Sequence, residues 1–214
     1  MNHRLFFASA VTIYSLAVGN AQADEALDTH WDDCRKTNTC RIEFDHLATQ
    51  ESDPFMFLGR VMDNEQARWR QFRRAIHEYP DVERCLVRTE WNRREPNLLL
   101  IDWDRTGTGR GAEVCLFRIA RSLGNLERLQ QWLVYHGFEL SELHKYRGED
   151  YVVRYETQPV SHMSAYWATE RYRERNPSWI RALTGFDPLL RYEVVFRFSE
   201  TNQVVEVSVV TATK

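Results

Sequence analysis

Residues 102–113 combine carboxylates, hydroxyls and glycine at the spacing of a calcium-binding loop. An EF-hand loop of about 12 residues places oxygen ligands at positions 1, 3 and 5, glycine at position 6, a backbone carbonyl at 7 and a bidentate carboxylate at 12. Counted from the first residue, these positions fall on Asp102, Asp104, Thr106, Gly107, Thr108 and Glu113. The spacing therefore predicts a Ca²⁺ site, and no other cofactor is expected.

Other features of this loop favour an ordinary solvent-exposed turn. Thr106 supplies a hydroxyl where Asp or Asn is usual, and Arg105 and Arg110 bring positive charge next to the proposed ion. Residues 98–101 have the pattern of a strand, whereas an EF-hand loop follows a helix. The glycines of residues 106–111 match neither a dinucleotide-binding fingerprint nor a P-loop. Calcium binding and a solvated loop both stay open, and nucleotide binding is not expected.

Aromatic and arginine side chains gather in residues 162–179. These residue types dominate the energetic centres of protein interfaces, and they also stack on sugars. We expect a partner-binding site at Arg171, Tyr172, Arg173 and Arg175. The alternative is that the rings fill the core beneath a sheet while the arginines face water. For the binding function, the expected partner is an envelope protein or an envelope polymer.

The histidines do not define a catalytic site. The chain has no G-x-S-x-G element, and the adjacent pairs Asp45-His46 and His77-Glu78 are expected by chance in a chain this charged. Two distant carboxylates of the kind that glycoside hydrolysis uses cannot be recognised as partners from the sequence. We therefore assign no catalytic residue, and an enzyme is the less favoured class.

Residues 1–23 have the features of a secretory signal peptide. Arg4 precedes a mostly apolar run that is too short to span a bilayer, and Ala21-Gln22-Ala23 is a signal-peptidase motif. The mature chain is expected to begin at Asp24 and to be periplasmic or secreted. No later segment is long and apolar enough to predict a membrane span.

The even number of cysteines fits an exported protein. Disulfide bonds form in oxidising compartments, and an even set permits full pairing. Three pairings are possible, of which we favour Cys34 with Cys40 and Cys85 with Cys115. The absence of a C-x-x-C motif argues against a structural zinc site.

Charge and length exclude other classes. The formal net charge of −3 is spread along the chain, with no basic stripe of the kind that binds nucleic acid. The basic residues are nearly all arginine, since Lys36, Lys145 and Lys214 are the only lysines. The mature length suits one domain, residues 24–214, with a sizeable core.

Hydrophobic periodicity defines the elements that position these residues. Helical spacing or capping signals predict helices at residues 63–80, 126–136, 162–175 and 177–185. Residues 112–123 fit a helix or a strand, of which we favour the helix. Alternation predicts strands at residues 40–47, 84–89, 98–103, 138–146 and 151–156. The clearest pattern is a hairpin over residues 191–213, in which Tyr192, Val194, Phe196 and Phe198 share one face and Val205, Val207 and Val209 continue the alternation.

These elements predict an α+β fold in which helices pack mainly on one face of an antiparallel sheet. The units follow a helix-strand-strand order, and two disulfides brace them. The favoured function is an exported soluble binding protein without catalytic activity. The alternative is an exported hydrolase supported by calcium at residues 102–113. The oligomeric state is not predicted.

Overall fold

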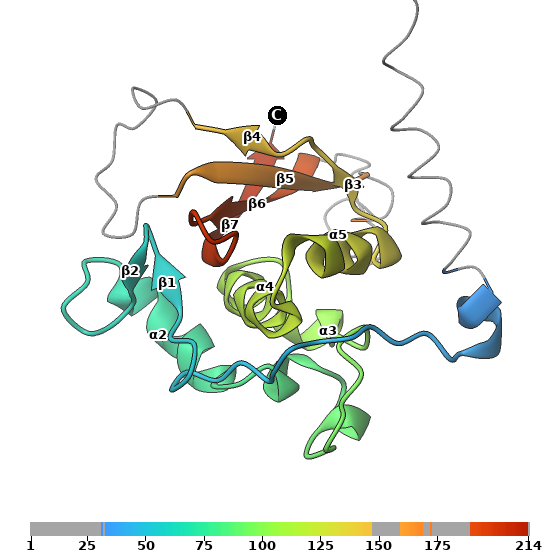
Figure 1. The fold of residues 1–214 in the computed structure, drawn as a ribbon. Helices are drawn as coiled ribbons and strands as arrows, with labels where there is room; N and C mark the ends of the chain where they lie inside the picture. The colour runs from blue at the N-terminus through green and yellow to red at the C-terminus, as the bar shows by residue number, and fades with distance from the viewer. Residues whose placement is uncertain (1–30, 32, 147–158, 169–171, 173–188, 214) are drawn as a thin grey trace, which may run out of the picture.

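A computed structural model describes residues 31, 33–146, 159–168, 172 and 189–213 (Figure 1). The protein has a disulfide-braced α+β fold, as predicted. A sheet forms one layer, α4 and α5 lie directly beneath it, and α2 and α3 lie farther away on the same side. The predicted signal peptide, residues 1–23, lies outside the described residues.

The main sheet is antiparallel in all of its described pairings. Its strands are β3 Glu139–Leu140, β4 His144–Lys145, β5 Ser161–Trp167, β6 Leu189–Phe198 and β7 Val204–Thr213. The order is β3-β5-β6-β7, and β4 also pairs with β5. The predicted strand at 138–146 is thus two short strands separated by residues 141–143.

The predicted C-terminal hairpin is confirmed as β6 and β7. Its inward side chains on β6 are all buried: Tyr192, Val194, Phe196 and Phe198. A register shift after Arg197 brings Val204 opposite Phe198. At this irregularity Val204 and Val205 are both buried, and the predicted alternation resumes at Val207.

Two of the predicted helices form the layer beneath the sheet. Residues 112–123 lie in α4, Arg110–Leu123, and residues 126–136 correspond to α5, Leu126–Tyr135. α4 contacts β7 on one side and α2 on the other. Gly124 and Gly137 follow the two helices with φ angles of 78° and 73°, a left-handed conformation that glycine adopts without steric cost.

The helix predicted at residues 63–80 is confirmed, but it begins later. It is α2, Trp69–Glu78, and Arg68 occupies its N-cap. Asp63 does not cap it, because its carboxylate accepts a 2.9 Å hydrogen bond from Glu65 N in a preceding turn. Two short paired strands come before this turn: β1 Met56–Phe57 and β2 Arg60–Val61.

The strands predicted at residues 84–89 and 98–103 are wrong. This region contains two 3₁₀ turns and a short helix: η1 Glu83–Cys85, η2 Arg88–Glu90 and α3 Trp103–Thr106. One antiparallel bridge, between Leu86 and Ile101, remains of the expected pairing. Side-chain acceptors take the neighbouring backbone donors: Asp81 accepts from Arg84 N at 2.8 Å. Such local bonds compete with strand formation.

The helix predicted at residues 162–175 is wrong over residues 162–167, which lie in β5. Residue 172 is helical, and residues 169–171 and 173–175 lie outside the described residues. Met163, Ala165 and Trp167 are buried, as is Ser164, whereas His162 and Tyr166 are half-buried. Apolar residues in this stretch fit both helical and strand spacing, and pairing with β6 along the whole of β5 selects the strand. Residues 151–156 and 177–185 lie outside the described residues.

Residues 40–47 do not form the predicted strand. They run as an extended segment past α4 and α5, on the side away from the sheet (Figure 1). Asp45 N donates to the carbonyl of Ser122 at the end of α4, at 2.9 Å. No described strand lies beside the segment, so its alternating pattern has no ladder to join.

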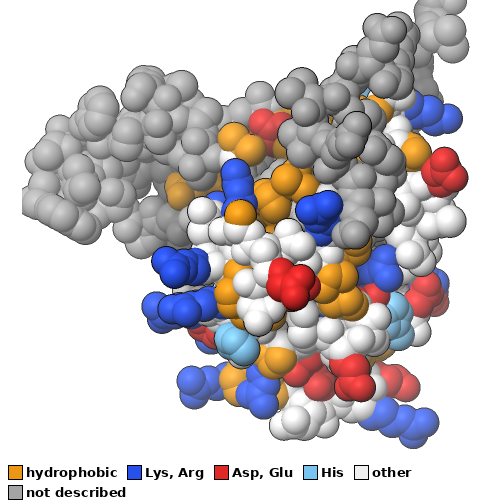
Figure 2. Space-filling model, turned by 90° about the vertical axis from the view of Figure 1, so that its left-hand side faces the viewer, with side chains coloured by type: hydrophobic (Ala, Val, Ile, Leu, Met, Phe, Trp, Pro, Cys, Tyr) orange, Lys and Arg blue, Asp and Glu red, His pale blue; other side chains and the backbone are white. Residues whose placement is uncertain are grey.

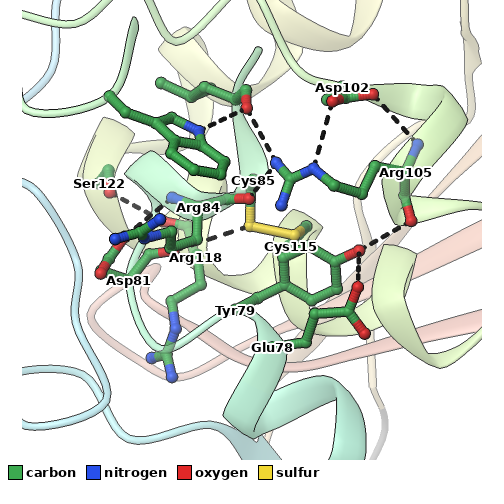
Figure 3. Close-up of a disulfide and its surroundings, with 12 residues drawn as sticks. Glu78, Tyr79, Asp81, Arg84, Cys85, Asp102, Arg105, Cys115, Arg118 and Ser122 are labelled. Carbon is green, nitrogen blue, oxygen red and sulfur yellow. Dashed lines mark hydrogen bonds and ion pairs between the residues drawn. A yellow bond between two sulfur atoms is a disulfide. The ribbon is translucent and has the colours of Figure 1, made fainter. Parts of the chain in front are cut away.

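Both favoured disulfides are present. Cys34 and Cys40 close a short loop, with a sequence separation of 6, whereas Cys85 and Cys115 are separated by 30 residues. The second bond joins η1 to α4 and is fully buried (Figure 3). Around it, Tyr79 donates a 2.8 Å hydrogen bond to the carbonyl of Arg105.

The core lies between the sheet and the helices. Its largest buried side chains include Trp132, Trp167, Phe117 and Phe196. Trp132 donates to the carbonyl of Leu98 at 2.7 Å, which satisfies its one polar group. Among the described residues, no helix is both long and apolar enough to cross a membrane.

Candidate functional site

The solvent-exposed side of α2 carries a cluster of positively charged side chains. Phe72, Ala75 and Ile76 are buried, so the opposite side of the helix faces solvent. That side holds Arg70, Arg73 and Arg74, all of them exposed. We call these three residues the α2 basic face. The arginines follow from the helical period, since they fall off the apolar stripe.

The α2 basic face is unfavourable for the helix itself. Arg70 is three residues from Arg73 and four from Arg74, and like charges at these spacings destabilise a helix by roughly 0.2–0.5 kcal/mol per pair. The first turn has no acidic residue to offset the helix dipole. Glu78 lies 4.0 Å from Arg74, but Arg70 and Arg73 have no ion pair within the described chain. An anionic partner would remove this repulsion.

Further arginines flank the α2 basic face. Arg68 lies over the ring of Phe57, with its guanidinium carbon 4.8 Å from the ring centre. Arg110 lies over Phe72 at 4.6 Å and donates to Gln71 at 3.3 Å. Figure 2 looks onto the side of the molecule that carries α2 and the β1–β2 hairpin, and it shows several Lys and Arg side chains gathered there.

A second candidate site is a pocket between residues 45–46, the end of α4 and the β6–β7 turn. Its volume is about 210 Å³, and its polar lining includes His46, Arg121, Asn125 and Gln203. His46 Nε2 lies 2.7 Å from Asp53 Oδ2. A carboxylate in this position can orient a histidine and stabilise its protonated form, which is the arrangement that general acid–base catalysis uses.

The carboxylate of Asp53 is held by several partners. Arg121 Nε donates to Oδ1 at 2.7 Å, and Ser52 donates to Oδ2 at 2.9 Å. Burial by itself would raise the pKa of Asp53, but the hydrogen bonds from His46, Arg121 and Ser52 outweigh it and hold the pKa below its ordinary value. Asp53 is therefore ionised at neutral pH. Ser52 and His46 share one carboxylate oxygen, so they do not form a serine nucleophile and its base.

Behind Asp53, the buried guanidinium of Arg118 holds the same loop. It donates to the carbonyl oxygens of Thr49, at 3.0 Å, and Asp53, and to the side chain of Gln50. Burial lowers the pKa of Arg118 to about 10, so the side chain stays charged at neutral pH. These contacts fix residues 49–53 against α4 and set the position of Asp53.

The predicted calcium ligands are drawn into other interactions. Asp102 is the N-cap of α3: its Oδ1 accepts from Arg105 N at 3.1 Å, and its Oδ2 accepts from Arg105 Nε at 3.2 Å (Figure 3). Glu113 is buried, and its two oxygens accept from Arg110 at 2.5 Å and from Val209 N at 2.9 Å. In the part of the chain that is described, no group of three or more His, Cys, Asp or Glu side chains could hold a metal ion.

The remaining residues of the predicted calcium loop lie in different environments. Asp104 is exposed, Thr106 is buried, and Gly107 ends α3. Thr108 Oγ1 lies 3.4 Å from the hydroxyl of Tyr172. Calcium binding at this loop stays a prediction.

The predicted partner-binding residues are described only at Tyr172. Its ring packs on Tyr192, with ring centres 5.2 Å apart, and it is half-buried. This contact agrees with the alternative that rings of this stretch pack against the core. Arg171, Arg173 and Arg175 lie outside the described residues, so their role in binding stays a prediction.

Sequence reasoning missed the pair formed by His46 and Asp53. In the sequence, His46 is adjacent to Asp45, as expected by chance, and Asp53 lies in a predicted loop. The loop residues 49–53 do carry Ser and Asp next to Pro54, which is a turn signal. That signal gives no indication that the loop packs against Arg118 and Arg121.

Comparison with known proteins gives no relative. No family model, no curated protein and no solved structure matches this chain.

Proposed function

We propose that this chain is an exported, non-catalytic binding protein, and that the α2 basic face recognises an anionic polymer of the cell envelope. The observation that carries the proposal is the presence of Arg70, Arg73 and Arg74 on one exposed side of α2. Their charges repel each other within the helix, and a polyanion would convert this repulsion into binding energy.

A polymer fits this face better than a folded protein does. Stable protein interfaces contain a buried apolar centre, whereas the α2 basic face carries no apolar side chain of its own. Among the described residues, the exposed large hydrophobic side chains are Val61 and Val210, neither of which belongs to α2. Arginine also forms paired hydrogen bonds with carboxylate and phosphate groups.

Export is supported by the leader pattern of residues 1–23 and by the two disulfides. If the chain is exported, mass spectrometry of protein from its native host will find an amino terminus at Asp24 and no free thiols. An intact Met1 would contradict export.

Binding is tested with poly-L-glutamate by isothermal titration calorimetry at low and moderate salt. The variant R70E/R73E/R74E should weaken binding roughly tenfold or more, because it reverses three charge contacts. The matched control K36E/R88E/R94E changes the net charge equally at exposed positions away from α2. Equal losses in both variants would show that net charge, and not the α2 basic face, determines binding.

A second candidate function, an exported hydrolase, is favoured by one observation: His46 lines a pocket and is bound to the buried Asp53. Hydrolysis of p-nitrophenyl acetate should then fall at least tenfold in H46A, measured near neutral pH, and stay unchanged in the exposed control H77A. Equal rates in both variants would exclude His46 as a general base for this substrate.

A further inference from the structure

The backbone of the extended segment at residues 41–44 forms no hydrogen bond with any other described residue. On one side of it, Cys40 O accepts from Asn97 Nδ2 at 2.8 Å. On the other side, Asp45 N donates to Ser122 O. Between these anchors, the backbone groups of 41–44 make no hydrogen bond to any described residue. Unpaired extended backbone of this kind is a template for another strand.

There is room beside this backbone. A groove of about 480 Å³ is lined by residues 41–44 together with Glu95, Pro96 and Asn97. A second groove, of about 410 Å³, is lined by residues 41–43 together with α5. Each groove borders the segment along its length, so a neighbouring chain can approach the backbone without displacing an element of the fold.

The side chains of the segment alternate as they do in a strand. Ile42 is buried against the core, whereas Arg41 and Glu43 are exposed. The side chain of Glu43 is 89% exposed, and its contact with Arg128 is long, at 3.5 Å. Exposed ion pairs of this kind contribute little, so Glu43 is free to take another partner.

The sequence around Ile42 is self-complementary in charge. If two copies of the segment pair antiparallel about Ile42, Arg41 of each copy lies opposite Glu43 of the other. Residues directly opposite in an antiparallel pair interact, and opposite charges there are favourable. The two-fold arrangement repeats the ion pair on both sides of the axis. A second copy of this chain always supplies the complementary charges, whereas a strand from an unrelated protein would supply them only if its sequence happened to contain them.

We propose that this protein forms a homodimer in which residues 41–43 of the two copies pair as antiparallel strands. The two-fold axis of the dimer passes between the two Ile42 residues. The pairing satisfies the free backbone groups and forms two Arg41–Glu43 ion pairs between the copies. It does not involve α2, so it is independent of the proposed polymer binding. Each dimer would carry two α2 basic faces, which raises the avidity for a long polyanion.

The test is a charge swap measured by sedimentation equilibrium over a wide range of protein concentration. Wild type should be dimeric. In R41E and in E43R, like charges face each other, and the dissociation constant should rise roughly tenfold to a hundredfold. The double variant R41E/E43R restores opposite charges and should dimerise as wild type does. An equimolar mixture of R41E and E43R should form heterodimers.

The controls separate pairing from folding and from general charge effects. E51R and R94E reverse exposed charges outside the segment and should leave the dimer unchanged. Circular dichroism should show the same secondary structure for every variant, and the same melting temperature at a concentration low enough that every variant is monomeric. A monomeric wild type overturns the proposal, and strand addition from another protein would then be the use of this edge. A dimer that is insensitive to R41E and E43R, or a double variant that is not rescued, also overturns it.

Discussion

Arg121 and Asp53 form an ion pair of 2.7 Å between residues that are 68 positions apart in the sequence. The pair joins α4 to the loop that contains Asp53, whose carboxylate also binds His46. Asp53 has a side-chain exposure of 3%, whereas Arg121 reaches the pocket at 22%. This contact, together with those of Arg118, holds residues 49–53 against α4.

Removing the charge of Asp53 should therefore be costly. D53N leaves Arg121 without its carboxylate, and breaking a buried pair in this way costs about 3–5 kcal/mol. Urea unfolding at neutral pH measures the loss. The exposed Asp104 provides the control, and D104N should change the free energy of unfolding by less than about 0.5 kcal/mol. A similar small change in D53N would mean that the loop is held by backbone contacts instead.

The stability that Asp53 provides should depend on pH in a definite direction. Its pKa is lowered in the folded protein, so the unfolded state binds a proton more readily. The contribution is therefore fully present above the ordinary carboxylate pKa and is lost as the pH falls through the lower, folded value. The difference in unfolding free energy between wild type and D53N should shrink as the pH falls through that range. A difference that is constant with pH would contradict this linkage.

The two disulfides should contribute unequally. In the chain-entropy model, the Cys85–Cys115 bond, with a separation of 30 residues, stabilises more than Cys34–Cys40, with a separation of 6. The expected values are about 3.6 and about 2.2 kcal/mol. C85A/C115A and C34A/C40A can be compared by urea unfolding. An equal loss would indicate that strain or residual unfolded-state structure outweighs loop entropy.

Replacing Gly111 by alanine should destabilise the protein although Gly111 lies in a helix. Alanine ordinarily favours a helix by about 1 kcal/mol over glycine. A methyl group at this position would overlap the backbone carbonyl oxygen of Thr106, which cannot move without shifting α3. Thermal unfolding of G111A should show a lower melting temperature than wild type. A higher one would show that α3 can shift at little cost.

Calcium should have little effect on stability if the contacts of Asp102 and Glu113 with Arg105 and Arg110 persist in solution. The melting temperature should then be the same with 5 mM Ca²⁺ (about a thousandfold above the Kd of a sensor site) and with EDTA. A Ca²⁺-dependent rise that disappears in D102N would establish the predicted ion site. Thr108→Val provides a control, because its position supplies only a backbone carbonyl.

The sequence alone determined those elements whose burial pattern has a single period. α5 and the hairpin of β6 and β7 follow from such patterns, because burying one face of each element already selects its conformation. α4 is buried on nearly all sides, so its sequence favours a helix without excluding a strand. The arginines of the α2 basic face follow in the same way, since the buried stripe of α2 leaves them in solvent. The disulfide pairs were favoured correctly among three choices.

Only the tertiary structure decided those conformations and contacts that depend on a residue far away in the sequence. Residues 161–167 fit either period, and β6 makes them a strand, whereas residues 40–47 have a strand pattern but no neighbour to pair with. The contacts of Asp53 with His46 and Arg121 depend on packing of a loop against α4, and no local spacing encodes that packing. Local preferences are worth a fraction of a kcal/mol per residue, so long-range pairing and burial outweigh them.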